Sequence, residues 1–234
     1  MKESEMIYSF CNKNVKERMR DHIKRALDTF NVNSRIVKYG NSLEPKFFEK
    51  LEIAIIFHDF GKIIIRSVRD GNCTFPGHEI VSGWGVYRYM TLRGYKDIDR
   101  YQVTLGIMLH HHPMDIEKRV KIVRNNFGQK QVTQNNFNDF FNEIEGVIDN
   151  NVELPREQVI KAGEKVTEVI NQSIQIFNEG WKKIWMSSGK KEKKVFLLLL
   201  QGLVASDYNS AKERGSATGF NKVIEDFVNL NNGF

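Results

Sequence analysis

The sequence predicts a mainly α-helical fold with one small β-hairpin. Apolar residues recur three and four positions apart in most segments between loops, which is the spacing of one helix face. Pro45 and Pro113 stand where a helix is expected to begin and to stop. Only the stretch around Asp70-Gly71 has a hairpin pattern. No repeat or linker divides the 234 residues, so we expect a single domain over 1–234.

The first half of the chain predicts two helices and then the hairpin. "VKERMRDHIKRALDTF", residues 15–30, places His22 on an apolar helix face that also holds Val15, Met19, Ile23, Ala26 and Phe30. A second helix is expected after Pro45, through "KFFEKLEIAIIFHDFGK". "IIIRSVRDGNCTF" has β-branched residues on both sides of Asp70-Gly71, which favours the hairpin.

Helical patterns return after the hairpin. Two helices are predicted in "HEIVSGWGVYRYMTLRG" and in "DIDRYQVTLGIMLHHH", the second ending before Pro113. Residues 118–150 are polar and basic, and we expect a loop-containing insertion with one helix around "FNDFFNEIEGVI". Further helices are expected at roughly 155–178, at 191–208 and from about 219 onward.

The charge of the chain indicates an acidic partner. The net charge is +6 and the isoelectric point is near 9.2, which is typical of proteins that bind nucleic acid. Two basic clusters stand out: Lys118, Arg119, Lys121, Arg124 and Lys130, and then Lys190, Lys191, Lys193 and Lys194. We expect the first cluster to follow the phosphates of a nucleic acid, although such runs are also common on a solvated surface.

Cysteine content and hydropathy favour the cytoplasm. Cys11 and Cys73 are the only cysteines and are too few for a disulfide framework, and "MKESEMIYSF" lacks the order of a secretion signal. The longest apolar run, 195–205, is about half the roughly 20 residues of a membrane span. We therefore expect a cytoplasmic protein without a membrane segment.

The histidines and two aspartates predict a metal site. All six histidines lie in predicted helices or at their ends: His22, His58, His78, His110, His111 and His112. With Asp59 and Asp207 they form a nitrogen and oxygen donor set that suits a transition metal better than calcium. Asp59 has two oxygens and could bridge two ions. Lys62 follows Asp59 by three residues and His58 by four, so it lies on the same side of the predicted helix as they do and can approach an anionic substrate.

The order of these motifs resembles the HD superfamily of metal-dependent phosphohydrolases. A helical histidine precedes "HDFGK", and "GHE", "IMLHH" and a late aspartate follow, so the similarity runs from His22 to Asp207. Within the superfamily the sequence looks most like the HD nuclease of type I CRISPR interference. The resemblance implies an HD-domain helical bundle and cleavage of DNA.

The resemblance also assigns roles to individual residues. It implies that one ion is held by His22, His58, Asp59 and Asp207. It implies that a second ion is held by Asp59, His78, His110 and His111, and it leaves the third residue of the triplet, His112, open. Lys62 matches a family lysine expected to contact the phosphate, which makes Asp59 and Lys62 the candidate catalytic residues. Gly61 is expected to let the substrate or a neighbouring helix come close.

The expected function is hydrolysis of single-stranded DNA, and of RNA as a further candidate, by two divalent ions in antiviral defence. Manganese or magnesium leads the expected metals, with nickel, cobalt and iron open, as is endonuclease against exonuclease action. No G-x-x-x-x-G-K-[ST] motif occurs, so we expect a stand-alone nuclease that works with a separate CRISPR-associated helicase and an RNA-guided surveillance complex.

Other interpretations stay open at this point. His22 alone is typical of a hydrogen-bonded core histidine, Asp207 of a helix-terminal carboxylate and Lys62 of a solvated lysine. His78 could simply start a helix, and the triplet could lie on the surface. For the whole protein, the rivals are an HD phosphohydrolase that acts on nucleotides or cyclic nucleotides, and a binding module in which metal only stabilises the helices.

Overall fold

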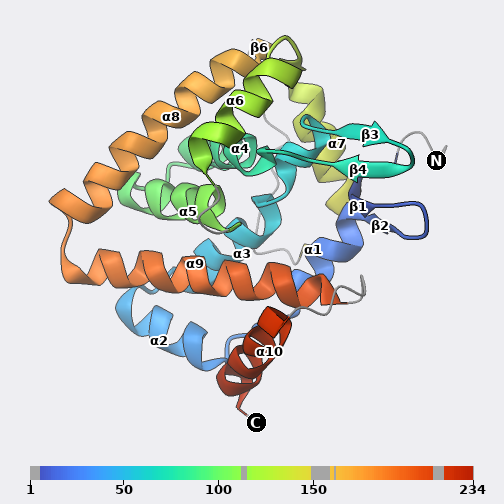
Figure 1. Ribbon diagram of the computed structural model, residues 1–234. Coiled ribbons are helices and arrows are strands. Elements are labelled where there is room, and N and C mark those ends of the chain that lie inside the picture. Colours follow the sequence, from blue (N-terminus) through green and yellow to red (C-terminus); the bar gives the residue numbers. More distant parts are fainter. Residues whose placement is uncertain (1–5, 112–114, 149–158, 161, 213–218, 234) are drawn as a thin grey trace.

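The computed structural model describes residues 6–111, 115–148, 159–160, 162–212 and 219–233 (Figure 1). The fold is mainly helical, as predicted. The α-helices are α1 (Met19–Leu27), α2 (Arg35–Leu43), α3 (Phe47–Phe57), α4 (His78–Leu92), α5 (Asp97–Leu109), α6 (Ile116–Phe127), α7 (Gln134–Ile144), α8 (Val166–Lys182), α9 (Lys190–Ser210) and α10 (Gly219–Asn232). A 3₁₀ helix η2 (Phe60–Ile63) follows α3, and a π-helical turn η3 (Lys183–Ser187) follows α8.

In the described residues, three small antiparallel sheets lie at the edges of the helices. They pair β1 (Tyr8–Cys11) with β2 (Lys16–Arg18), β3 (Ser67–Arg69) with β4 (Asn72–Thr74), and β5 (Gln131–Val132) with β6 (Glu164–Lys165). The β3–β4 hairpin is the predicted one. Its two turn residues, Asp70 and Gly71, both have positive φ, at 52° and 79°, as the tight turn of a two-residue hairpin requires.

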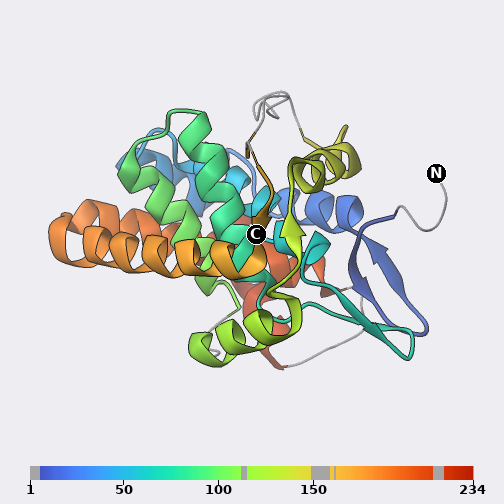
Figure 2. The same ribbon diagram turned by 90° about the horizontal axis from the view of Figure 1, so that it is seen from above.

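Helix α5 lies at the centre of the bundle and packs against α3, α4, α8 and α9. Figure 2, seen from above, places α7 beside α1 and near the N-terminal hairpin. An aromatic cluster connects α7 to the chain that leaves α3: Phe60 lies 4.4 Å from Phe137 and Phe57 lies 5.7 Å from Phe140, measured between ring centroids. All four rings are fully buried. This packing fixes the segment between Phe57 and Phe60.

The break between α3 and η2 differs from the predicted continuous helix. Helix α3 ends at Phe57, and Asp59 has φ −103° and ψ 1°, outside the helical region. The amide of Gly61 donates to Ser82 Oγ of α4 at 2.8 Å, so tertiary packing replaces the helical hydrogen bond of that amide. His58 and Asp59 therefore do not lie on one regular helix.

The N-terminal and middle segments also need correction. Residues 16–18 form β2 rather than helix, and Val15 is exposed rather than on the buried face. The 118–150 segment contains the one predicted helix as α7, and it also contains most of α6 and the strand β5, which were not predicted. Its polarity concealed the apolar face of α6, formed by Val120, Val123 and Phe127. These three residues are spaced three, four and seven positions apart, which is the spacing of one helix face.

Two other predicted boundaries shift. Helix α5 ends at Leu109, before the predicted end at residue 112. Helix α8 starts at Val166, and the predicted start near 155 falls outside the described residues. Helices α9 and α10 agree with expectation, α9 running two residues further. Among the described helices, none combines the length and hydropathy needed to cross a bilayer.

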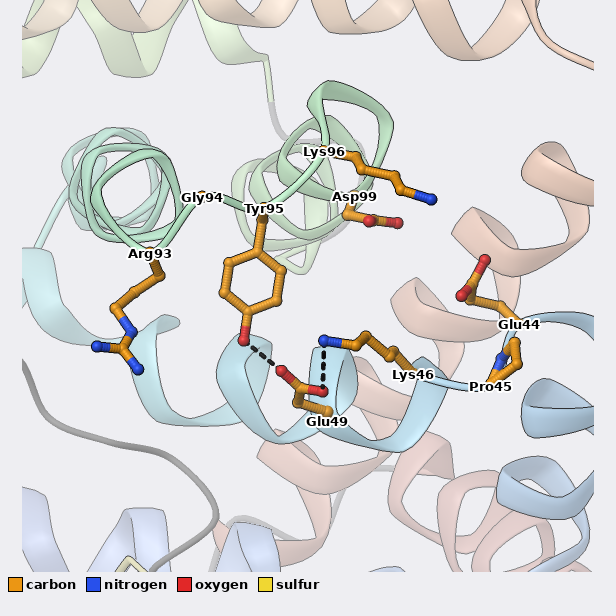
Figure 3. Close-up of a pocket in the computed structure, with 9 residues that line it drawn as sticks. All are labelled: Glu44, Pro45, Lys46, Glu49, Arg93, Gly94, Tyr95, Lys96 and Asp99. Carbon is orange, nitrogen blue, oxygen red and sulfur yellow. Dashed lines mark hydrogen bonds and ion pairs between the residues drawn. The ribbon is translucent and has the colours of Figure 1, made fainter.

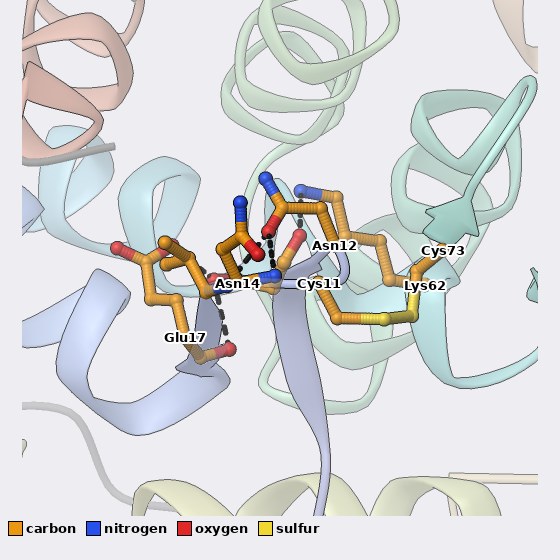
Figure 4. Close-up of a disulfide and its surroundings, with 8 residues drawn as sticks. Cys11, Asn12, Asn14, Glu17, Lys62 and Cys73 are labelled. Carbon is orange, nitrogen blue, oxygen red and sulfur yellow. Dashed lines mark hydrogen bonds between the residues drawn. A yellow bond between two sulfur atoms is a disulfide. The ribbon is translucent and has the colours of Figure 1, made fainter. Parts of the chain in front are cut away.

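Cys11 and Cys73 form a disulfide that the sequence argument did not anticipate (Figure 4). Their Cα atoms lie 5.1 Å apart, and the bond ties β1 to β4. The two residues are separated by 62 positions, and only the packing of two hairpins brings them together. The absence of a disulfide framework therefore no longer argues for a reducing compartment.

Breaking this disulfide should destabilise the fold. Closing a loop of 62 residues removes chain entropy from the unfolded state, worth at most about 4 kcal/mol. We expect Cys11→Ser, Cys73→Ser and the double variant to lower the free energy of unfolding in urea by similar amounts. A thiol reductant should lower that of the wild type alone. If the reductant leaves the wild-type curve unchanged, the two sulfurs are not bonded in solution.

Candidate metal centre

Residues on or directly after five helices bring the predicted ligands to one buried place. His22 comes from α1, His58 and Asp59 follow α3, His78 begins α4, His110 and His111 follow α5, and Asp207 lies near the end of α9. Six of these seven side chains are buried, and His111 is partly exposed. His112 lies outside the described residues.

The first group consists of His22, His58, Asp59 and Asp207. The Nε2 atom of His22 lies 3.4 Å from Asp59 Oδ2 and 3.2 Å from Asp207 Oδ1. The Nε2 atom of His58 lies 3.5 and 3.6 Å from the same two oxygens. Two imidazoles and two carboxylates thus enclose a single small space.

The second group consists of His78, His110 and His111, and one ligand atom of each lies within 4.8 Å of the others. His78 Nε2 lies 3.1 Å from His111 Nε2 and 3.1 Å from Asp59 Oδ1. His110 also faces the first group, because its Nε2 lies 4.0 Å from Asp207 Oδ2. His110 therefore stands between the two groups, whereas the sequence assigned it to the second alone.

Asp59 connects the groups through its two oxygens. Oδ2 faces His22 and His58, while Oδ1 faces His78. The carboxylate is fully buried at the non-helical position between α3 and η2. A carboxylate in this position can serve two ions at once, as a bridging ligand does.

Hydrogen bonds to Nδ1 fix how the imidazoles face the centre. His58, His78 and His110 each place Nδ1 2.6–2.7 Å from the backbone carbonyl three residues earlier. Nδ1 must then carry the hydrogen, so Nε2 presents a lone pair to the centre.

His22 reaches the same state through a residue that sequence analysis missed. Its Nδ1 lies 2.9 Å from Ser210 Oγ, and the hydroxyl hydrogen of Ser210 is donated to Asp207 O at 2.7 Å. Nδ1 is therefore the donor of the first bond. The predicted helix stopped at 208, and an extension by two residues would have included Ser210, one turn after Asp207.

The electrostatics of the centre favour ionised carboxylates and mostly neutral imidazoles. Burial raises the pKa of Asp59, but His58 and Lys62 outweigh it and hold that pKa well below its usual range. Burial lowers the pKa of His110 to about 3. Burial also opposes a charge on His58, yet the carboxylates of Asp59 and Asp207 prevail and its pKa is raised. His58 is thus the imidazole that most readily takes up positive charge.

Several acceptor atoms of the centre face one another at short distance. The Nε2 atoms of His22 and His58 lie 3.2 Å apart, and both present lone pairs if the rings are neutral. Among the described residues, Asp59 Oδ1 and His110 Nε2 are buried without a hydrogen-bond partner. A proton on His58 relieves only the first contact. The mixed nitrogen and oxygen donors fit divalent transition metals, which would satisfy all of these atoms.

Lys62 is an internal partner of the centre and not a solvated lysine. Its Nζ donates to Asp59 Oδ2 at 2.7 Å and to the Ser9 carbonyl at 3.0 Å, and the residue is 7% exposed. An ammonium group has three hydrogens, so one is left for an anionic substrate. Figure 4 places Lys62 next to the disulfide.

Gly61 allows α4 to approach the centre. A Cβ atom there would lie 2.1 Å from the carbonyl oxygen of His78. This is the neighbouring helix that the sequence analysis expected Gly61 to admit. The absence of a side chain at Gly61 therefore sets the distance between Asp59 and His78.

The basic cluster expected to bind nucleic acid is partly committed to internal contacts. Arg119 donates a hydrogen bond to Glu79 and forms an ion pair with it, and Glu79 is buried next to His78. Arg124 donates to Asn171 and Lys130 donates to the Ile64 carbonyl. Arg119 and Glu79 thus hold α6 to the start of α4, a role that the sequence run did not reveal.

A separate pocket of about 520 Å³ lies at the start of α3 and the turn between α4 and α5 (Figure 3). None of the predicted ligands lines it. Glu49 in this pocket forms an ion pair with Lys46 and accepts a hydrogen bond from the Tyr95 hydroxyl. We therefore place the candidate function at the histidine centre.

Gly61→Ala should impair the centre without removing a ligand. The methyl group must push α4 away from Asp59, so we expect weaker metal binding in calorimetric titrations with manganese. Gly106→Ala in α5 is the matched control, because a Cβ atom there meets nothing within 4 Å. That control should bind as the wild type does. Equal affinity in both variants would show that the close approach is unimportant.

Comparison with known proteins adds no assignment: no family model matches the chain, and no curated protein does. The candidate function therefore depends on the geometry of the centre and on the chemistry of its residues.

Proposed function

We propose that the protein is a metal-dependent nuclease that hydrolyses phosphodiester bonds of single-stranded DNA at the histidine centre. The observation that carries this proposal is the position of Asp59. Its two oxygens face two separate groups of imidazoles within one buried centre.

The donor set is suited to two divalent ions. His22, His58, Asp59 and Asp207 would hold one, and Asp59, His78, His110 and His111 the other. When bound, such ions lower the pKa of a water molecule and neutralise charge on phosphate oxygens. Manganese and magnesium are the leading candidates, with nickel, cobalt and iron also compatible with these donors.

The side chains prepare the centre for an anion. Asp59 and Asp207 supply two negative charges, which a positive charge on His58 offsets only in part. Lys62 balances part of this charge and has a third N–H for a non-bridging phosphate oxygen. The ammonium of Lys62 is already held in place, since its Nζ also lies over the Phe75 ring, 5.4 Å from the centroid.

The similarity of motif order to HD nucleases of type I CRISPR interference supports this class of substrate. On this proposal the protein acts in the cytoplasm in antiviral defence, on DNA unwound by a separate helicase at an RNA-guided surveillance complex. A single-stranded substrate is favoured because a flexible backbone can bend toward a recessed centre.

Replacement of Asp59 tests the proposal directly. We expect Asp59→Ala to slow cleavage of labelled single-stranded DNA in manganese or magnesium by about 10³-fold or more, because both ion sites lose a ligand. Elemental analysis should show loss of both ions. Asp21 is an exposed carboxylate on α1, and Asp21→Ala should change neither the cleavage rate nor the metal content. Full activity of Asp59→Ala would refute the assignment.

The same assay separates the rival functions. Wild-type activity on deoxynucleotides or cyclic dinucleotides, without cleavage of DNA, would indicate a nucleotide phosphohydrolase. Metal binding without hydrolysis of any of these substrates, together with unfolding on metal removal, would indicate a binding module.

Lys62→Gln should separate catalysis from metal binding. Glutamine keeps hydrogen-bonding capacity but removes the positive charge that faces the substrate. We expect cleavage to fall by about 10²-fold while the manganese content stays near that of the wild type. A variant that loses its metal in proportion to its activity would show that Lys62 only organises Asp59.

A further inference from the structure

A second pocket opens beside the metal centre and has a basic lining. Its volume is about 590 Å³, within the range of ligand sites. Residues of β1, α1, η2 and α7 line it. Figure 1 shows α7 and β1 on the side of the molecule that carries the β1–β2 and β3–β4 hairpins. The charged residues that line it are Arg18, Arg20, Lys62, Arg66, Asp139 and Glu143.

Only some of these charges are available to a ligand. Arg18 donates twice to Glu143, at 3.0 and 3.1 Å, so this pair is neutral and closes one wall. Arg20 makes no hydrogen bond or ion pair with any part of the chain that the structure describes. Asp139 is exposed. Unlike Glu143, it has no ion pair with a described residue, so its negative charge would repel an anion in the pocket.

Arg66 is held in place but not neutralised. Its guanidinium lies over the Tyr8 ring, 5.5 Å from the centroid, which orients it without cancelling its charge. Its Nε is buried and has no hydrogen-bond partner among the described residues. A buried donor without a partner is costly, and a ligand oxygen would relieve it.

Lys62 connects this pocket to the metal centre. It lines the pocket, while its Nζ lies 2.7 Å from Asp59 Oδ2. Arg66 follows it by four residues, and Arg20 precedes the ligand His22 by two in α1. One anion in the pocket and another at the centre would therefore lie next to each other, on either side of Lys62.

We infer that Arg20 and Arg66 bind a backbone phosphate of single-stranded nucleic acid next to the phosphate held at the metal centre. Guanidinium groups present paired donors that match phosphate oxygens. The inference rests on the proposed function, and it replaces the Lys118–Lys130 run as the main phosphate contact. All of that run except Lys130 lies on α6, where Arg119 is already bound to Glu79.

Binding without metal tests this inference independently of cleavage. The probe is a labelled oligothymidylate, titrated in EDTA by fluorescence anisotropy over a range of potassium chloride. Arg20→Gln and Arg66→Gln should each raise Kd by about fivefold to tenfold and reduce the slope of log K against log salt by about 0.7. Asp139→Asn should change Kd in the opposite direction, tightening binding by about twofold.

The control is the double variant Lys118→Gln/Lys121→Gln, which removes two exposed charges of α6. Its Kd and salt slope should stay near those of the wild type. Thermal unfolding of each variant checks that the fold is retained, and Asp139→Asn gives a second test if Arg66→Gln unfolds.

Three results would overturn the inference: no binding by the wild type, unchanged binding by both arginine variants, or an equal loss in the α6 control. Failure of the proposed nuclease function gives a different pattern. In that case the oligothymidylate still binds with arginine dependence, but the wild type cleaves no DNA in any metal.

Discussion

The burial of two carboxylates among imidazoles is the constraint on which the rest of the structure depends. Asp59 and Asp207 are ionised in a region almost without solvent, and a buried charge is costly unless opposite charge or hydrogen bonds surround it. The ammonium of Lys62 supplies part of the opposite charge. His58 supplies another part, since the pKa of His58 is raised. The remaining acceptors, Asp59 Oδ1 and His110 Nε2, are satisfied by no described side chain, and these are the atoms that the proposed cations would satisfy.

The scaffold maintains this arrangement through features with no chemistry of their own. The end of α3 at Phe57 turns Asp59 out of the helix, and Phe60 anchors the following turn against α7. Gly61 allows α4 to approach, so that His78 meets the second oxygen of Asp59. Backbone carbonyls orient three of the rings, because a bond at Nδ1 leaves Nε2 free to act as a ligand. A small displacement of α4 would therefore affect both groups at once.

Ion pairs decide which basic residues remain available to a polyanion. Arg119 and Arg18 are bound to Glu79 and Glu143, and both pairs join separate segments of the fold. Arg20 and Arg66 line one pocket with Lys62, which contacts the centre. Neither arginine forms an ion pair with a described carboxylate. A count of positive residues along the chain thus indicates an acidic partner, but it does not locate the surface that meets it.

The sequence by itself determined the helical class, the hairpin at Asp70-Gly71 and the residue types of the centre. Each depends on local rules: helix spacing, a turn that needs positive φ, and the donor chemistry of histidine and aspartate. Only the tertiary structure decided the break after Phe57, the Cys11–Cys73 bond, the place of His110 between the groups and the internal partners of Lys62 and Arg119. These features arise from contacts between segments far apart in the chain, and local residue spacing does not specify these particular contacts.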